Sequence, residues 1–144
     1  MNRRLQVVAE LSSLPEIHRF ALEVAEAAGL EEMAAYRLRL SVDELTTNVM
    51  EHGGDGPQDK PAATIELSAE IEGGSLRLQI IDDGPPFDPT KKPPPADMHL
   101  PAEQRQLGGL GIFLAIDGVD EFHYELSAGR NCVTLVVHRP QTPS

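Results

Sequence analysis

Hydrophobic and polar residues follow two different periods along the chain. Residues 4–11, RLQVVAEL, carry β-branched side chains and favour a short strand. The stretch that follows predicts a first helix ending near residue 28. Ser13 and Glu16 stand at the spacing of a capping box, and Gly29 is a suitable helix stop.

A second, longer helix is predicted from about residue 31 to residue 52. Its apolar residues recur at helical spacing and define one buried stripe, formed by Leu38, Val42, Leu45 and Val49. The stretch after this helix, GGDGPQDKP, has the composition of a loop.

The period then becomes that of strands. The stretch ATIELSAEIEGGSLRLQIIDDG alternates apolar and polar residues on both sides of Gly73 and Gly74, which predicts a β-hairpin. Residues 85–107 hold seven of the twelve prolines and show no period, as in a long functional or disordered loop. GGLGIFLAIDGVD predicts a helix led by glycines, and a last hairpin turns near Gly129.

This order of elements predicts an α/β two-layer sandwich, with helices on one face of a mostly antiparallel sheet. The length of 144 residues and the 40% hydrophobic content are those of a single domain, covering residues 1–144. Strands and helices do not alternate regularly, which argues against a dinucleotide-binding Rossmann fold.

The composition of the chain excludes some classes of binding partner. The net charge of −11 opposes direct binding to nucleic acid and to anionic membranes. No apolar run is long enough to cross a membrane, so we expect a cytoplasmic protein. The single cysteine, Cys132, excludes an internal disulfide, and its simplest interpretation is a small strand residue.

Three polar residues of the second predicted helix stand one turn apart: Glu44, Asn48 and His52. Their row borders the apolar stripe, so a carboxylate and an amide face the edge of the core. Such oxygen ligands suit Mg²⁺, which keeps its waters and substrate phosphates. Taken alone, this spacing is more typical of an ordinary exposed helix face.

Two further stretches carry candidate chemistry. LQIIDDGPPF ends an apolar strand with Asp82, Asp83 and Gly84, and an acid there can accept a hydrogen bond from an exocyclic amine; a plain Asp-Gly turn is the alternative. LGGLGIFLA places glycines before a helix, where free backbone N–H groups favour an anion. A flexible turn is the alternative there.

Together and in this order, these stretches resemble the GHKL ATPases, the superfamily of gyrase, histidine kinases and MutL-type repair proteins. DELTTNVMEHG is similar to the N box, DDGPPF to the first glycine box and GGLGI to the second. The resemblance covers nearly the whole chain and implies the GHKL, or Bergerat, ATP-binding fold. The single-domain anti-sigma factor serine/threonine kinases are the most similar branch.

The resemblance implies a role for each matching residue. Asn48 would bind the Mg²⁺ that bridges the ATP phosphates, and Glu44 would activate the attacking hydroxyl. Asp82 would accept from the adenine amino group, and Gly84 would let the backbone approach the base. His52 would cap its helix. The phosphates would be cradled, under a lid at 85–107, by Gly108, Gly109, Leu110 and Gly111.

The sequence departs from the family pattern at two places. Pro86 stands where the first box has its second glycine, and proline lacks a backbone donor. Leu107 replaces a basic residue that precedes the second box in many of these kinases, although Arg105 is nearby, and Lys91 and Lys92 could also reach phosphate.

The leading hypothesis is therefore a kinase that uses ATP and Mg²⁺. Its implied partners are a STAS-type anti-anti-sigma factor, which it would phosphorylate, and a sigma factor, which it would sequester. Family members also commonly form homodimers. One alternative is an ATP-binding module that sequesters a regulator without phosphoryl transfer. Another is an α/β protein with coincidental glycines, which would bind no nucleotide.

Overall fold

The computed structural model of the protein describes residues 2–53, 63–91, 112 and 114–140. The elements follow one another as a strand, two helices, a hairpin and a second hairpin, with short 3-10 turns between. Their bounds are β1 (Asn2–Val8), η1 (Leu11–Ser13), α1 (Leu14–Ala27), α2 (Glu32–Gly53), β2 (Thr64–Glu72), β3 (Ser75–Asp82), η2 (Pro89–Lys91), β4 (Glu121–Ser127) and β5 (Arg130–His138).

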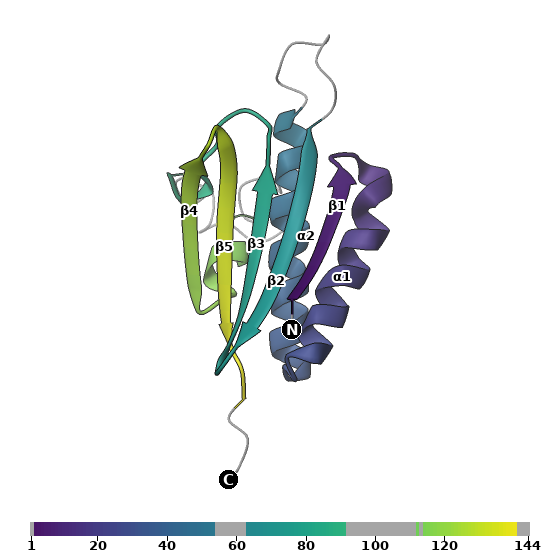
Figure 1. Ribbon diagram of the computed structural model, residues 1–144, viewed down its shortest axis with the longest axis vertical. Coiled ribbons are helices and arrows are strands. Elements are labelled where there is room, and N and C mark those ends of the chain that lie inside the picture. The colour runs from purple at the N-terminus through teal and green to yellow at the C-terminus, as the bar shows by residue number, and fades with distance from the viewer. Residues whose placement is uncertain (1, 54–62, 92–111, 113, 141–144) are drawn as a thin grey trace, which may run out of the picture.

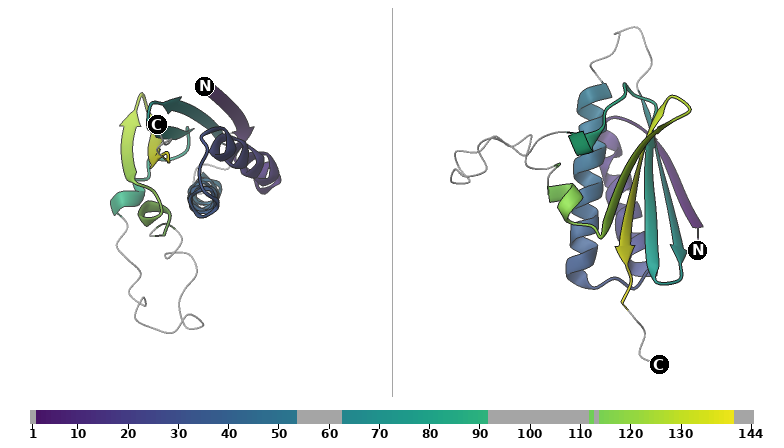
Figure 2. Two further views of the ribbon diagram at one scale, coloured as in Figure 1. Left: turned by 90° about the horizontal axis from the view of Figure 1, so that it is seen from below. Right: turned by 90° about the vertical axis from the view of Figure 1, so that its left-hand side faces the viewer.

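The strands form one five-stranded sheet in the order β1-β2-β3-β5-β4, and every neighbouring pair is antiparallel. Figures 1 and 2 show α1 and α2 together on one face of this sheet. The predicted two-layer sandwich is thus confirmed. The pairing of β3 with β5 places Asp82 directly opposite Asn131, and this register positions the site described below.

The core lies between the sheet and the two helices. The predicted stripe of α2 packs into it, with Leu38, Val42 and Leu45 almost completely buried and Val49 partly so. Most inward residues of β3 and β5 are aliphatic, and burying each such side chain contributes about 1.5–3 kcal/mol. The shared core fixes α2 against the strands that carry the site.

Helix α1 ends as predicted but begins differently. Gly29 adopts a φ of +70°, and the Leu30 N–H donates to the Ala25 carbonyl over 3.1 Å, which closes the helix. The predicted capping box is wrong, because the Ser13 hydroxyl donates to the Val8 carbonyl over 2.8 Å and makes no cap hydrogen bond. Ser13 therefore ties the start of α1 to the end of β1.

The first strand spans Asn2–Val8, so the prediction of residues 4–11 was shifted toward the C-terminus. Residues 11–13 instead form a 3-10 turn that carries the chain into α1. Cys132 lies in β5, and burial raises the pKa of its thiol, which fits an unreactive strand residue.

Residues 112 and 114–117 are helical and return to the core beside α2. Ile112 and Ala115 are buried, and the Ser41 hydroxyl of α2 donates to the Ala115 carbonyl over 2.9 Å. A Cβ on Gly118 would lie 3.1 Å from the Leu114 carbonyl, so glycine allows this close packing. None of the helices in the described ranges has the length and apolar character needed to span a bilayer.

Candidate functional site

A pocket lies between the second half of α2 and the adjoining ends of β3 and β5. Aliphatic side chains form most of its walls, and three polar side chains, those of Asn48, Asp82 and Asn131, reach it. The enclosed volume is only about 30 Å³, which is room for a water molecule. The remaining lining residues are Leu45, Val49, Ile80, Gly84, Pro85, Phe87, Pro89 and Val133.

Asp82 is the acidic group of this pocket. It continues the inward-facing alternation of Leu78 and Ile80 and is 7% exposed. Its Oδ1 accepts from the Gly84 N–H and from Asn131 Nδ2, both over 3.0 Å. Within the described residues, Oδ2 accepts no hydrogen bond. The pocket is therefore lined by a buried carboxylate group, one oxygen of which has free acceptor capacity.

Burial raises the pKa of the Asp82 carboxyl above its ordinary value, although the hydrogen bonds from Asn131 and Gly84 lower it. The ionised form is thus held in a poorly solvated place by two donors aimed at one oxygen. A ligand that donates a hydrogen bond to Oδ2 would satisfy the second oxygen of the Asp82 carboxylate.

The neighbouring acid, Asp83, has a structural role. Asp83 is exposed, and its Oδ1 accepts from the Thr64 N–H over 2.7 Å at the start of β2. It stabilises the junction between β2 and β3. Of the two consecutive aspartates, only Asp82 lines the pocket.

Gly84 lines the pocket directly beyond Asp82. A Cβ at this position would lie 3.1 Å from Asp82 Oδ1, closer than most real Cβ contacts. Glycine therefore allows the turn to fold tightly enough for its N–H to reach Asp82.

Asn48 and Glu44 lie one turn apart on α2, as the sequence predicts. Asn48 is 9% exposed and lines the pocket, on the wall opposite Asp82's strand. Glu44 is partly exposed and does not line it. Among the described residues, the Glu44 side chain has no hydrogen bond or ion pair, so its carboxylate is available at the surface beside the pocket.

Asp43 is engaged in structure. Its Oδ1 lies 2.8 Å from Nε2 of His18 on α1, and its Oδ2 lies 3.7 Å from Arg39 Nε. Burial raises the pKa of the Asp43 carboxyl, and these two basic groups oppose that rise. Of these two neighbouring acids, Asp43 therefore links α2 to α1, whereas the Glu44 carboxylate has no partner among the described residues.

The predicted phosphate-binding residues Gly108, Gly109, Leu110 and Gly111 lie outside the described residues, as does most of the lid predicted at 85–107. So do Leu107, Arg105 and Lys92, and the side chains of His52 and Lys91. The described beginning of that segment, at Phe87 and Pro89, covers one side of the pocket.

Sequence reasoning missed Asn131 and Tyr124. Asn131 is 4% exposed, and its Oδ1 accepts from the Tyr124 hydroxyl over 2.5 Å and from the Phe87 N–H over 3.0 Å. The sequence does contain one indication of Asn131, because this amide stands in phase with the inward-facing Val133 and Leu135 of β5. Its meaning depends on the pairing with β3, which lies far away in the sequence.

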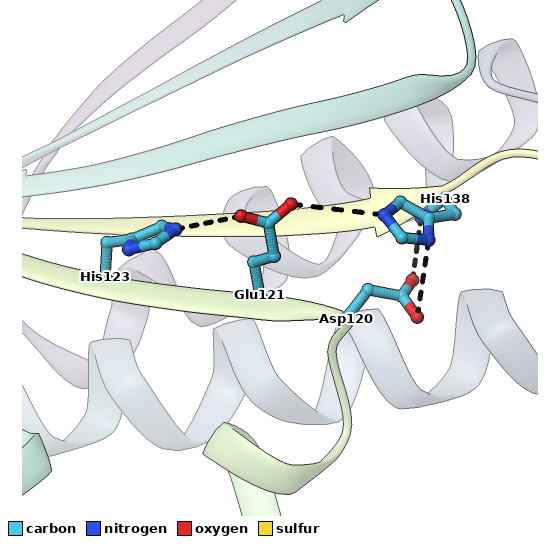
Figure 3. A network of polar contacts seen from close by, with 4 residues as sticks. All are labelled: Asp120, Glu121, His123 and His138. Atoms are coloured by element: carbon cyan, nitrogen blue, oxygen red, sulfur yellow. Dashed lines mark hydrogen bonds and ion pairs between the residues drawn. The ribbon is translucent and has the colours of Figure 1, made fainter.

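A second polar cluster lies at the opposite end of the sheet. Figure 3 shows Glu121 of β4 between two histidines, 3.1 Å from His123 and 4.0 Å from His138. The Asp120 carboxylate accepts from the backbone N–H of His138 over 2.7 Å. These side chains are exposed, and such surface pairs contribute about 0–1 kcal/mol. No group of three or more metal-ligating His, Cys, Asp or Glu side chains occurs in the part of the chain that the structure describes.

Comparison with known proteins identifies the class to which this fold and pocket belong. Residues 7–137 match the histidine kinase-like ATPase domain family. The chain is 31% identical over 116 residues to the serine-protein kinase RsbW of Listeria monocytogenes, and 30% identical to that of Listeria innocua. Each alignment covers 76% of this chain and 72% of the relative. The chain therefore belongs to the histidine kinase-like ATPase family, among the RsbW-like anti-sigma factor serine kinases.

Solved structures agree on the fold. The RsbU and RsbW domains of a Mycobacterium tuberculosis protein align with a TM-score of 0.63 at 20% identity, covering 96% of this chain and 33% of that one. The catalytic domain of the histidine kinase ThkA aligns with a TM-score of 0.53 at 13% identity, covering 95% and 97%. The predicted GHKL-type ATP-binding fold is confirmed.

Proposed function

We propose that the protein binds ATP with Mg²⁺, phosphorylates a serine or threonine of a STAS-type anti-anti-sigma factor, and sequesters a sigma factor in the cytoplasm. The observation that carries this proposal is the buried Asp82 carboxylate, which lines an apolar pocket beside Asn48 in an RsbW-like chain and has one oxygen without a hydrogen bond from the described residues.

The pocket fits an adenine base chemically. Asp82 Oδ2 would accept from the exocyclic amine, and the aliphatic side chains of α2, β3 and β5 would contact the ring faces. Guanine carries a carbonyl oxygen at the equivalent place, which would leave two acceptors facing each other. Because the enclosed volume is about 30 Å³, the pocket must widen when a base binds.

Asn48 fits a magnesium site shared with phosphates. Its carboxamide oxygen is a hard ligand, and Mg²⁺ takes few protein ligands when it also binds phosphate oxygens. When bound, the ion would neutralise charge that develops on the transferred phosphoryl group. Asn48 would be a protein ligand of this ion, and it lies on the same helix as Glu44, the proposed general base.

Glu44 would act as the general base. It is partly exposed and unpaired among the described residues, so a hydroxyl of a partner protein can reach it. It would orient that hydroxyl and take its proton as the oxygen attacks phosphorus. Asp43 could not replace it, because His18 and Arg39 hold that carboxylate.

The glycines Gly108, Gly109 and Gly111, with Leu110, would supply backbone N–H groups to the phosphates. The anchoring of Ala115 on α2 supports this role, since its contact with Ser41 lies only one turn from Glu44. The segment that follows the glycines therefore returns to the helix that carries Glu44 and Asn48.

A second candidate function is an ATP-binding module that sequesters a regulator without phosphoryl transfer. Pro86, which is exposed in the turn after Asp82, favours it, because a backbone donor of the family pattern is missing there. Transfer of labelled phosphate from ATP to the cognate anti-anti-sigma factor distinguishes the two functions.

A further inference from the structure

Asn131 uses all the hydrogen-bonding capacity of its side-chain amide. Nδ2 donates to Asp82 Oδ1 over 3.0 Å and to the Pro85 carbonyl over 2.9 Å. Oδ1 accepts from the Phe87 N–H and from the Tyr124 hydroxyl. An amide has two donor hydrogens and two acceptor lone pairs, so each is matched and the group can adopt only one orientation.

These bonds close the turn on both sides of Pro86. The amide holds the carbonyl of Pro85 and the N–H of Phe87, the peptide groups that flank the proline. Pro86 has no N–H of its own to hold the turn. The side chain of Asn131 therefore supplies from β5 the hydrogen bonds that the turn needs.

The same amide sets the direction of the Asp82 carboxylate. Because Asn131 and the Gly84 N–H both donate to Oδ1, rotation of the carboxylate would break two hydrogen bonds in a buried place. Oδ2 is left as the acceptor of a residue that lines the pocket.

We infer that Asn131 is a positioning residue for base recognition, which fixes Asp82 Oδ2 as a pure acceptor and ties the Gly84–Phe87 turn to β5. Tyr124, on the edge strand β4, supports it by donating to Oδ1. The inference rests on the proposed function, since it concerns how the adenine preference of that same pocket arises.

The test is Asn131→Asp, which keeps the size and both acceptors but replaces the donor to Asp82 with a carboxylate. Two carboxylates at this distance cannot both stay ionised, so they would share a proton and Asp82 would no longer be a fixed acceptor. The affinities for ATP and GTP are measured by calorimetry near pH 7.5 and near pH 5.5, with thermal unfolding as the check on folding.

The preference for ATP over GTP should fall about tenfold or more at the higher pH. It should fall further at the lower pH, where the carboxylate pair takes up more protons and Asp82 Oδ2 is less often a free acceptor. Loss of a merely structural contact would not make nucleotide discrimination depend on pH. The matched control is Gln79→Glu, the same amide-to-carboxylate change on β3, where Gln79 donates to Thr134 Oγ1 over 3.3 Å; it should leave the preference unchanged.

If Asn131→Asp does not fold, Tyr124→Phe decides, because it removes one donor to Oδ1 and keeps the ring. It should lower the ATP preference about two- to fivefold. A folded Asn131→Asp or Tyr124→Phe that keeps the parental preference overturns the role of Asn131 alone. A parent that binds neither nucleotide overturns the proposed function and, with it, this inference.

Discussion

Asp82 and Asn131 face each other across the β3 and β5 pair, and Asn131 Nδ2 donates to Asp82 Oδ1 over 3.0 Å. This hydrogen bond joins two segments that lie 49 positions apart in the sequence. The second oxygen of this buried carboxylate, which lines an apolar pocket, accepts no hydrogen bond from the described residues, and the proposed choice of adenine rests on that arrangement.

The substitution Asp82→Asn should weaken ATP binding while the protein stays folded. The new side chain can keep an acceptor oxygen toward Asn131 and Gly84, but it places an NH₂ donor toward the base amine. ATP affinity should therefore fall by about 2 kcal/mol or more, measured by calorimetry, while the far-UV spectrum stays native. Equal ATP and GTP affinities in the parent would contradict the assignment of Asp82.

The raised pKa of Asp82 predicts a pH dependence of stability. At a pH below the pKa that Asp82 has in the unfolded chain, about 3.9, its carboxyl is protonated in both states. Its burial then carries no charge penalty. As pH rises through the interval up to the higher folded-state pKa, the native state holds its proton longer, so the free energy of unfolding decreases. Asp82→Asn lacks this loss and should gain stability relative to the parent as pH rises toward neutrality. Denaturant titrations at several pH values measure the difference, and a pH-independent difference would contradict the burial argument.

Gly84→Ala should weaken nucleotide binding because its Cβ would press on Asp82 Oδ1. We expect a loss of about 1 kcal/mol in ATP affinity, since a shift of a few tenths of an ångström disturbs one buried hydrogen bond. Gly74→Ala is the matched control, because a Cβ there meets nothing within 4 Å. Equal ATP affinities of the two variants would argue against a tight turn at Gly84.

Asn48→Ala should weaken Mg-ATP binding while the fold is kept. The loss should be much smaller when Mg²⁺ is replaced by EDTA, because the amide acts through the metal. Thr47→Ala, the adjacent residue, which does not line the pocket, serves as the control. If Asn48→Ala bound Mg-ATP like the parent, Asn48 would not be a magnesium ligand.

The order of elements and the buried stripe of α2 could be predicted from the sequence, because both depend on local periodicity. The alternation of β3 also predicts which of the two aspartates faces inward, since Asp82 is in phase with Leu78 and Ile80. The role of Asn131 could not be predicted, because it arises from the pairing of β3 with β5. The capping box predicted at Ser13 is wrong because the hydroxyl of Ser13 donates to the Val8 carbonyl, a contact that the local sequence pattern does not indicate.

The most direct test of the central claim is phosphate transfer from labelled ATP to the cognate anti-anti-sigma factor, measured beside ATP affinity for the parent and for Glu44→Gln. Glutamine keeps the shape of Glu44 but cannot take a proton, so affinity should change little and the transfer rate should fall by about 10² or more. Glu51→Gln, an exposed change on the same helix, should leave both unchanged. A parent that binds ATP but labels no such partner, or a Glu44→Gln variant that transfers at the parental rate, would contradict the account.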